Sequence, residues 1–578
     1  MIEKLFSSKV TFAVLNALFN LPDKPLSTSE LIGATNKNQA NIQRELDKLA
    51  TGGLVLKIKK GNQNYYQLNK NYQYFNSLSN LLNDYNHKSQ KYILLNEESG
   101  TCFLSVDYIL RAYINDYGVR KGVVSDVLGA IAVYKNDYGQ YYFIKDVIEK
   151  GAEESLKKLL KDPSFVFKTI YPESIACGEE VQEIFERLKK RDFQVPKTEA
   201  IKLFDKFLEI ISIQIGLNTI AVFDLKDQLY SNYLKKYLID KTKNSPLSLG
   251  VAMEKLLAPE KLTSTQLLRI ELLKLALREQ ISQKSFNQAV DSLQYNWSWL
   301  NYGYVGPGLE RSYFAETLKE LQARPKEELN KELSDLLNNE KVIKHSKREV
   351  YQQLRIDEKH QKFIDALGLL SYLKIHRKDT AFLIFSCLYQ IFAKIMPSYK
   401  KKDLFNLTIE ESKDLLRDQL KVSGRELRDR SNYCAYIYHE NRFLYGKEVD
   451  KCLAERTIAD SQETATIGLK LLEGTAACLG KTGNWVYGEV RVINSSPDMA
   501  KMRDGDILVS VATTPDILPA MKKAAAIVTD HGGITCHAAI VSRELNIPCL
   551  IATKYATKVF KDGDKVVVCP RHNYIKFQ

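Results

Sequence analysis

The chain of 578 residues is too long for one hydrophobic core, so three or four domains are expected. Its composition, 44% hydrophobic and 26% charged, is that of a globular protein, and its net charge of +13 favours anionic partners without identifying them. Nine cysteines, scattered singly and never as C-x-x-C, argue against a disulfide framework or a zinc ribbon and favour a reducing cytosol.

The N-terminus and the most apolar stretch of the chain both bear on localisation. The start, MIEKLFSSKV, lacks the pattern of a signal peptide. The most apolar long run, residues 380–396, contains Gln390 and Lys394 and is too short to span a bilayer comfortably, so we predict a buried helix there. We therefore expect a cytoplasmic, multidomain α+β protein without membrane contact.

The N-terminal segment, residues 1–85, predicts three helices followed by a β-hairpin. Apolar residues at helical spacing and a Ser/Thr cap indicate helices at 9–20, 27–35 and 38–50. Two apolar runs on either side of a Gly-Asn turn indicate the hairpin, at 54–60 and 65–68.

This order of elements resembles the winged helix-turn-helix of bacterial and archaeal transcription regulators, in pattern and over about 75 residues. The resemblance implies that the third helix enters the major groove of DNA. The candidate DNA contacts are the polar residues on the outer face of that helix and the lysines of the hairpin: Gln39, Gln43, Arg44, Lys48, Lys57, Lys59 and Lys60. Residues 1–75 carry ten Lys/Arg against five Asp/Glu, as a phosphate-facing module requires. The alternative is a winged helix used only for protein contacts, and an amphipathic helix at 72–85 is a candidate for homodimerisation.

The central part of the chain gives little chemical information. Residues 90–150 mix apolar strands with turns, including a hairpin around Asn136–Gly139, and predict a small α/β segment. Helical periodicity dominates residues 151–465, which we predict to be mostly α-helical. The sequence has no G-x-x-x-x-G-K-[ST] loop, and we find no nucleotide-binding motif of an ATP-grasp domain. No bound cofactor is therefore expected.

The C-terminal segment, residues 470–578, alternates strands with short helices and predicts a compact α/β unit. Its most informative run is HGGITCHAAIVSRELNIPCL, residues 531–550. Gly532 and Gly533 allow a tight turn from a strand into a helix, and Thr535 is expected to cap that helix.

This cap would place His537 in the first turn of a helix over 536–545. Free backbone N–H groups at a helix start favour a bound anion, and the same positive end favours the neutral, nucleophilic imidazole over the imidazolium. Ala538 would leave the surroundings of the ring open. Arg543, which lies off the face of His537, is expected in a structural ion pair.

Two other chemistries fit the motif poorly. Zinc binding by His531, Cys536 and His537 would need two adjacent residues to face one metal ion. A Cys536–His537 dyad would need neighbours in sequence to converge, whereas on a helix they project apart. We therefore expect no metal site.

The run GGITCHAAIVSRELNIPC resembles the phosphohistidine signature of the phosphoenolpyruvate-utilising enzymes, which include phosphoenolpyruvate synthase, pyruvate phosphate dikinase, enzyme I of the sugar phosphotransferase system and rifampin phosphotransferase. The order of its residues is long and specific, and the flanking ATTPD and DGDKVVV runs match too. The resemblance implies a swivelling β/β/α domain with His537 as phosphoryl carrier. Thr535 would orient the imidazole, and Cys536 would lie beside the phosphate. The residues expected to support the phosphate are Gly532, Gly533 and Ala538.

Departures from the family pattern limit what the resemblance implies. Only about 30 residues follow the motif, so we expect no phosphoenolpyruvate-binding barrel after it, and no ATP-grasp domain before it. The phosphoryl donor, ATP or phosphoenolpyruvate with Mg, would then come from a protein or domain in trans. Three functions stay open: a phosphotransferase-like carrier serving an acceptor in the central region, a DNA-binding regulator that responds to phosphorylation of His537, and a scaffold with an idle histidine.

Overall fold

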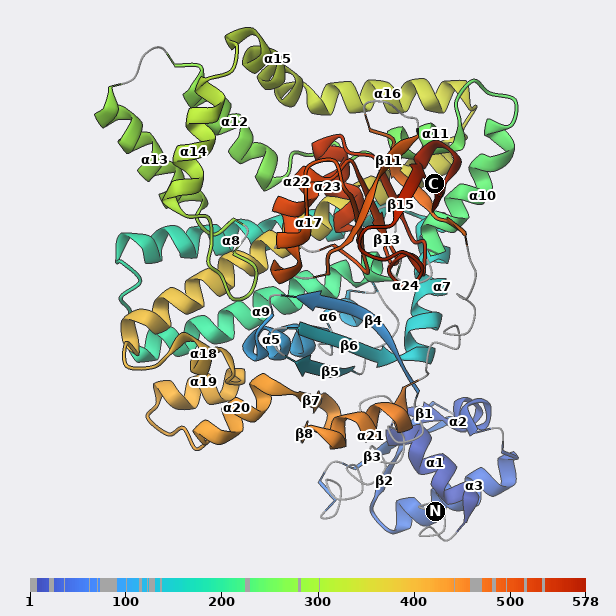
Figure 1. Ribbon diagram of the computed structural model, residues 1–578. Coiled ribbons are helices and arrows are strands. Elements are labelled where there is room, and N and C mark those ends of the chain that lie inside the picture. Colours follow the sequence, from blue (N-terminus) through green and yellow to red (C-terminus); the bar gives the residue numbers. More distant parts are fainter. Residues whose placement is uncertain are drawn as a thin grey trace. The chain divides into compact units, whose positions relative to one another are not determined.

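The computed structural model separates into two units, Met1–Lys91 and Tyr92–Gln578 (Figure 1). It describes residues 8–578 apart from 20–24, 36, 62, 70, 73–90, 100, 114–116, 122, 124–129, 136–137, 224–228, 279–281, 301, 441, 458–469, 481–484, 495, 514–516 and 533–535. The helix predicted at 72–85 therefore lies, but for its first residue, outside the described part of the chain.

The described residues of the first unit include α1 (Lys9–Phe19), β1 (Leu26–Ser27), α2 (Thr28–Thr35), α3 (Gln39–Thr51), β2 (Val55–Lys60) and β3 (Gln63–Leu68). Antiparallel β2 and β3 form a hairpin, and β1 pairs with the outer side of β3. Asn38 caps α3 by accepting a hydrogen bond from the N–H of Asn41 (2.9 Å). Buried Glu45 accepts one from the hydroxyl of Thr11 (2.7 Å), which ties α3 to α1. The helices and the hairpin lie where the sequence predicts them.

The second unit begins with a five-stranded sheet in the order β4-β6-β5-β7-β8. Its elements are β4 (Tyr92–Ser99), α5 (Phe103–Tyr113), α6 (Tyr117–Arg120), β5 (Ala130–Lys135), β6 (Tyr138–Ile144), β7 (Cys434–Ile437) and β8 (Arg442–Tyr445). The last two strands come from the region predicted to be mostly α-helical, and β7 pairs with β5 through Ile131 and Ile437. Sequence reasoning missed them because a four-residue apolar run has no periodicity that separates strand from helix.

Helices fill most of the chain between the two halves of this sheet. They are α7 (Lys145–Lys161), the π-helical turn η2 (Val166–Ile170), α8 (Tyr171–Lys190), α9 (Lys197–Val222), α10 (Leu229–Thr242), α11 (Leu249–Leu257), α12 (Ser264–Ala276), α13 (Gln283–Trp297), α14 (Arg311–Gln322), α15 (Lys326–Leu337), α16 (Asn339–Gln353), α17 (Glu358–Ile395), α18 (Lys401–Phe405), α19 (Ile409–Leu416) and α20 (Gly424–Asn432). Helix α21 (Lys447–Arg456) follows the last strand of the sheet, β8. The prediction of a multidomain, mostly helical α+β protein is confirmed at this level.

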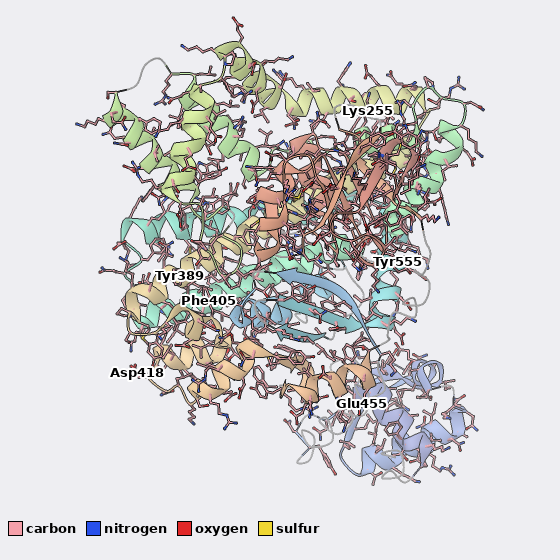
Figure 2. The ribbon with its side chains drawn as sticks, in the orientation of Figure 1. Lys255, Tyr389, Phe405, Asp418, Glu455 and Tyr555 are labelled. Carbon is pink, nitrogen blue, oxygen red and sulfur yellow. The ribbon has the colours of Figure 1, made fainter. Side chains whose placement is uncertain are left out.

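The longest helix, α17, runs through the second unit and packs along α8 and α9 (Figure 1). Its second half contains the apolar run predicted as a buried helix, and Phe382 and Phe385 are indeed buried there. Near its end Tyr389 lies beside Phe405 of α18, with ring centroids 5.8 Å apart and the ammonium of Lys401 over both rings (Figure 2). In the described part of the chain, no helix combines the length and the apolar character needed to cross a membrane.

The C-terminal segment folds around an eight-stranded sheet in the order β10-β14-β13-β12-β11-β15-β16-β9. Its elements are β9 (Leu471–Glu473), β10 (Thr475–Cys478), β11 (Val486–Val492), η5 (Ser496–Lys501), β12 (Ile507–Ser510), α22 (Leu518–Lys523), β13 (Ala526–Thr529), α23 (His537–Leu545), β14 (Cys549–Ile551), α24 (Ala556–Val559), β15 (Lys565–Cys569), η7 (Pro570–His572) and β16 (Tyr574–Phe577). Strands β11, β12, β13 and β14 are parallel neighbours, and the outer strands join antiparallel. Strand–helix alternation thus produces the predicted α/β arrangement.

One side of this C-terminal segment packs on the helices, in what we call the docking interface: β10, η7, α22 and α23 against α11, α14 and α17. Helix α11 contacts β10 and η7, and a Cβ atom built on Gly250 would lie 3.7 Å from Cβ of Ala476. The ammonium of Lys522 lies 5.9 Å from the ring centroid of Tyr313. Buried apolar residues of α22, α23 and α17 belong to one continuous core. The interface brings the start of α23 close to α17.

Candidate functional site

The first residue of helix α23 is His537, and the residue that caps the helix is Cys536. The backbone of Cys536 is extended (φ −78°, ψ 166°), and its Sγ accepts a hydrogen bond from the N–H of Ala539 at 3.5 Å. The sequence predicts Thr535 as the cap, and the structure corrects this by one position, to Cys536. Thr535 itself lies outside the described residues. A thiol can replace a hydroxyl at an N-cap because sulfur is also an acceptor, although a weaker one.

Burial raises the pKa of the Cys536 thiol, which therefore stays protonated near neutral pH. A reactive cysteine needs the thiolate, so this environment suits a capping residue better than a nucleophile. The side chain of Cys536 also explains why a residue with a side chain would not fit at one of the two preceding glycines. Gly532 has φ +122°, and a Cβ atom at that position would lie 2.7 Å from Sγ of Cys536. Gly533 lies outside the described residues.

The imidazole of His537 is held by a residue that sequence reasoning did not identify. Oγ1 of Thr513 lies 2.9 Å from Nδ1 of the ring. Thr513 follows β12 and His537 follows β13, and these adjacent parallel strands end at the same edge of the sheet. An Nδ1–H that donates to Thr513 leaves the lone pair of Nε2 free to act as a nucleophile. The only signal in the sequence was the ATTPD run that contains Thr513.

The electrostatic surroundings of His537 disfavour protonation. Burial and the positive charge of Lys378 on α17 lower the pKa of the imidazole to about 3, so the ring is neutral at pH 7. One turn earlier on α17, the charge of Lys374 acts on Cys536. The first N–H groups of α23 have no acceptor within the helix, and they add to the positive potential at its start.

The rest of α23 is a packing helix. Ala538, predicted to leave space around the ring, is 1% exposed and belongs to the core, so only its backbone is left to face an anion. Nε of Arg543 donates to the carbonyl of Ala477 on β10 (2.9 Å), and the carboxylate of Glu254 on α11 contributes an opposite charge nearby. Arg543 thus has a structural role, in a hydrogen bond to the backbone as well as in charge pairing.

Among the described residues, no group of three or more His, Cys, Asp or Glu side chains is arranged to hold a metal ion. His531 is exposed, and its backbone N–H donates to the carbonyl of Val511 (2.9 Å).

The predicted DNA-facing residues lie on the surface of the first unit. Gln39, Arg44 and Lys48 of α3 are exposed, and Lys57, Lys59 and Lys60 of β2 are exposed as well. Gln43 is partly buried, because its amide donates to the hydroxyl of Tyr66 (2.8 Å) and to Asp47 (3.2 Å). Asp47 also pairs with Lys57 at 3.3 Å, so one of the three hairpin lysines is already matched by a carboxylate of α3.

Comparison with known proteins concerns the C-terminal segment. Residues 502–572 match the family model described as "PEP-utilising enzyme, mobile domain". A probable phosphoenolpyruvate synthase of Archaeoglobus fulgidus is 51% identical over 119 residues, which is 21% of this chain and 15% of that protein. Phosphoenolpyruvate synthases of Pyrococcus furiosus and Escherichia coli are 48% identical over 116 residues and 33% identical over 171 residues, covering 14% and 21% of those proteins.

The chain therefore spans only about a fifth or less of the length of these relatives. The likeness defines the class of its C-terminal domain, a mobile domain of the phosphoenolpyruvate-utilising type, and His537 lies within the matched residues.

The low pKa of His537 can be measured directly. In the full chain with 15N-labelled histidine, the imidazole of His537 should remain neutral at pH 5, because its pKa of about 3 lies below the ordinary 6.5. The unfolded chain binds the proton more readily, so the docked, folded state should lose stability as the pH falls from about 6.5 towards 3. His537→Gln identifies the resonance among the eight histidines. Half-protonation near pH 6.5 would contradict the prediction.

Proposed function

We propose that the protein is a phosphohistidine carrier: His537 takes a phosphoryl group from a donor supplied in trans and passes it to an acceptor. The observation that carries the proposal is a neutral imidazole at a helix start, aligned through Nδ1 by Thr513. The match of residues 502–572 to a mobile domain of phosphoenolpyruvate-utilising enzymes supports the same chemistry. Since the relatives are named phosphoenolpyruvate synthases, phosphoenolpyruvate and ATP are the donors to test first.

In the proposed step, the Nε2 lone pair of His537 attacks the phosphorus atom of the donor. The P–N bond forms while the P–O bond to the leaving group breaks, and the departing oxygen keeps the electron pair. The hydroxyl of Thr513 accepts a hydrogen bond from Nδ1–H and so holds the ring in place while Nε2 forms its bond to phosphorus. The N–H groups at the start of α23, which belong to the same domain as His537, would stabilise the phosphoryl oxygens. Mg²⁺ would accompany the donor and screen its phosphate charges. The acceptor takes the group from His537 by the reverse bond changes.

A carrier of this kind has to move, because donor and acceptor seldom fit around one fixed imidazole. We propose that the C-terminal domain leaves the docking interface to meet its donor. The hinge is expected before Gly474, within residues 454–466 or just after them, and most of these residues lie outside the described part of the chain. Motions of this type typically take microseconds to milliseconds.

Phosphorylation of His537 tests the proposal itself. The purified chain alone should not label from ATP or phosphoenolpyruvate, whereas extract of its own cells with either donor should give acid-labile, base-stable label. His537→Ala should abolish the label and Thr513→Val should reduce it, because the ring loses its partner at Nδ1. Thr535→Ala is also expected to reduce it, and Cys536→Ser should be tolerated because a hydroxyl caps well. Acid-labile label that persists in His537→Ala would refute the assignment.

An engineered disulfide tests the movement. The Cβ separation of 3.7 Å between positions 250 and 476 fits a disulfide, so the Gly250→Cys/Ala476→Cys variant should cross-link α11 to β10 on oxidation. The oxidised variant should take up label at His537 at least tenfold more slowly than the reduced one. Each single-cysteine variant and the wild type, whose nine cysteines are free, serve as controls under the same oxidant. Equal labelling of locked and unlocked protein would show that the domain need not leave the interface.

The second candidate function, which we also propose, is DNA binding by the first unit as a winged helix. Exposed Arg44 and Lys48 on α3 and the exposed lysines of β2 support it, since basic side chains suit contacts with phosphates. In this proposal the protein is a cytoplasmic regulator in which the charge added at His537 alters DNA binding, and a homodimer would match a two-fold operator. The alternative use of the unit, for protein contacts alone, predicts no response to DNA.

A gel shift separates these alternatives. The full chain should bind duplex DNA, and affinity should fall steeply with salt because lysines displace counterions from phosphates. Arg44→Ala should cost about 1–3 kcal/mol if its guanidinium reads a base. Lys59→Ala/Lys60→Ala should weaken binding to all sequences, and adding Lys57→Ala should do so further. Wild type and triple variant running identically at low salt would exclude this DNA-binding surface.

A further inference from the structure

Helix α17 carries three cations within two turns, in the run Lys-Ile-His-Arg-Lys-Asp at 374–379. At 100° per residue, Lys374, Arg377 and Lys378 fall within an arc of about 100° on one side of the helix. His376 lies on the opposite side, where its Nε2 is 3.1 Å from the carbonyl oxygen of Ser174 on α8. The packing of His376 on α8 therefore turns the cationic arc away from α8.

The C-terminal domain lies over this arc. The charge of Lys378 acts on the imidazole of His537, and the charge of Lys374 acts on the neighbouring Cys536. Lys374 is 8% exposed, so its side chain is largely shielded from solvent. The buried residues of α23 and α17 belong to one apolar core of the second unit.

Arg377 adds a third cation to the same arc. One of its guanidinium nitrogens, Nη1, is buried and has no hydrogen-bond partner among the described residues. A buried donor without an acceptor costs free energy that an oxyanion would recover.

These charges make the docked arrangement selective for one state of His537. An imidazolium would be repelled by Lys378, and a neutral ring is tolerated. A phosphoryl group on Nε2 carries up to two negative charges and three acceptor oxygens, and lysine ammonium groups bind such oxygens well.

We propose that Lys374 and Lys378 of α17 form a binding site for the phosphoryl group carried by His537, with Arg377 as an additional donor. The docking interface is then the resting position of the phosphorylated carrier, and loss of the phosphoryl group loosens it. This inference rests on the proposed carrier function. It adds the place at which the domain docks when His537 is phosphorylated.

The rate of disulfide trapping between positions 250 and 476 reports docking. The reduced Gly250→Cys/Ala476→Cys chain is phosphorylated with potassium phosphoramidate, which transfers a phosphoryl group to imidazole nitrogen without an enzyme, and is then oxidised. Phosphorylation should raise the trapping rate about tenfold, the effect of one charge-assisted hydrogen bond. The same chain with His537→Ala gives the baseline for modification of other histidines.

Removing the cations should abolish this response. In the trapping background, Lys374→Met/Lys378→Met should label at His537 but show no increase in trapping, while Lys374→Arg/Lys378→Arg should keep it. The matched control, Lys359→Met/Lys362→Met, removes two lysines from the solvent-facing first turns of the same helix and should behave as the parent. The arginine variant guards against misfolding as the cause of a lost response.

Two results would overturn the inference without touching the proposed function. One is labelled His537 with a trapping rate equal to that of the unlabelled chain. The other is an equal increase when inorganic phosphate is added to unphosphorylated protein, which would assign the cations to a free anion. If His537 takes no label from phosphoramidate or from cell extract, the carrier function itself fails.

Discussion

Burial of the imidazole of His537, with the positive charge of Lys378 nearby, is the constraint on which the proposed chemistry of this site depends. Both disfavour protonation of the ring, and a neutral ring is the form that can attack phosphorus. The effect of Lys378 belongs to the docked arrangement, because Lys378 is a residue of α17. In the proposed carrier cycle, the ring, its cap and its threonine partner move together.

The threonine partner of His537 and the cations of α17 are held in place for different physical reasons. The β12 and β13 strands run parallel and adjacent, so the loops that follow them meet at one edge of the sheet and bring Thr513 to Nδ1 of His537. The cations come from a helix that is rigid for another reason. Helix α17 packs along α8 and α9 and buries much of its length, which gives its lysines a fixed position.

The docking interface combines apolar packing with polar contacts that are easily exchanged for water. Helix α11 packs on β10, with room for a Cβ atom at Gly250, and apolar residues of α22 and α23 continue the core of the helices. The polar part includes Glu254, whose carboxyl pKa is raised by burial against β10. Burial of a carboxylate opposes docking while the apolar contacts favour it, and such a balance suits the proposed opening of the interface.

Local features of the chain were predictable from the sequence because they depend on residues a few positions apart. The three helices and the hairpin of the first unit, the buried run in α17 and the helix beginning at His537 all follow from periodicity, caps and turn residues. The phosphohistidine motif is likewise contiguous, so its order of residues alone was enough to identify the candidate nucleophile.

Only the tertiary structure decided which distant residues meet. The pairing of β5 with β7 joins segments about 300 residues apart, and short apolar strands carry no signal of their partners. Thr513 lies 24 positions before His537, and the cations of α17 lie more than 150 positions before it. Nothing local to these residues encodes the contacts, because they arise from strand order and from the packing of one domain on another. The sequence by itself determined the candidate phosphoryl-carrying residue, and the fold determined the partners of its imidazole, its protonation state and the surface that it faces.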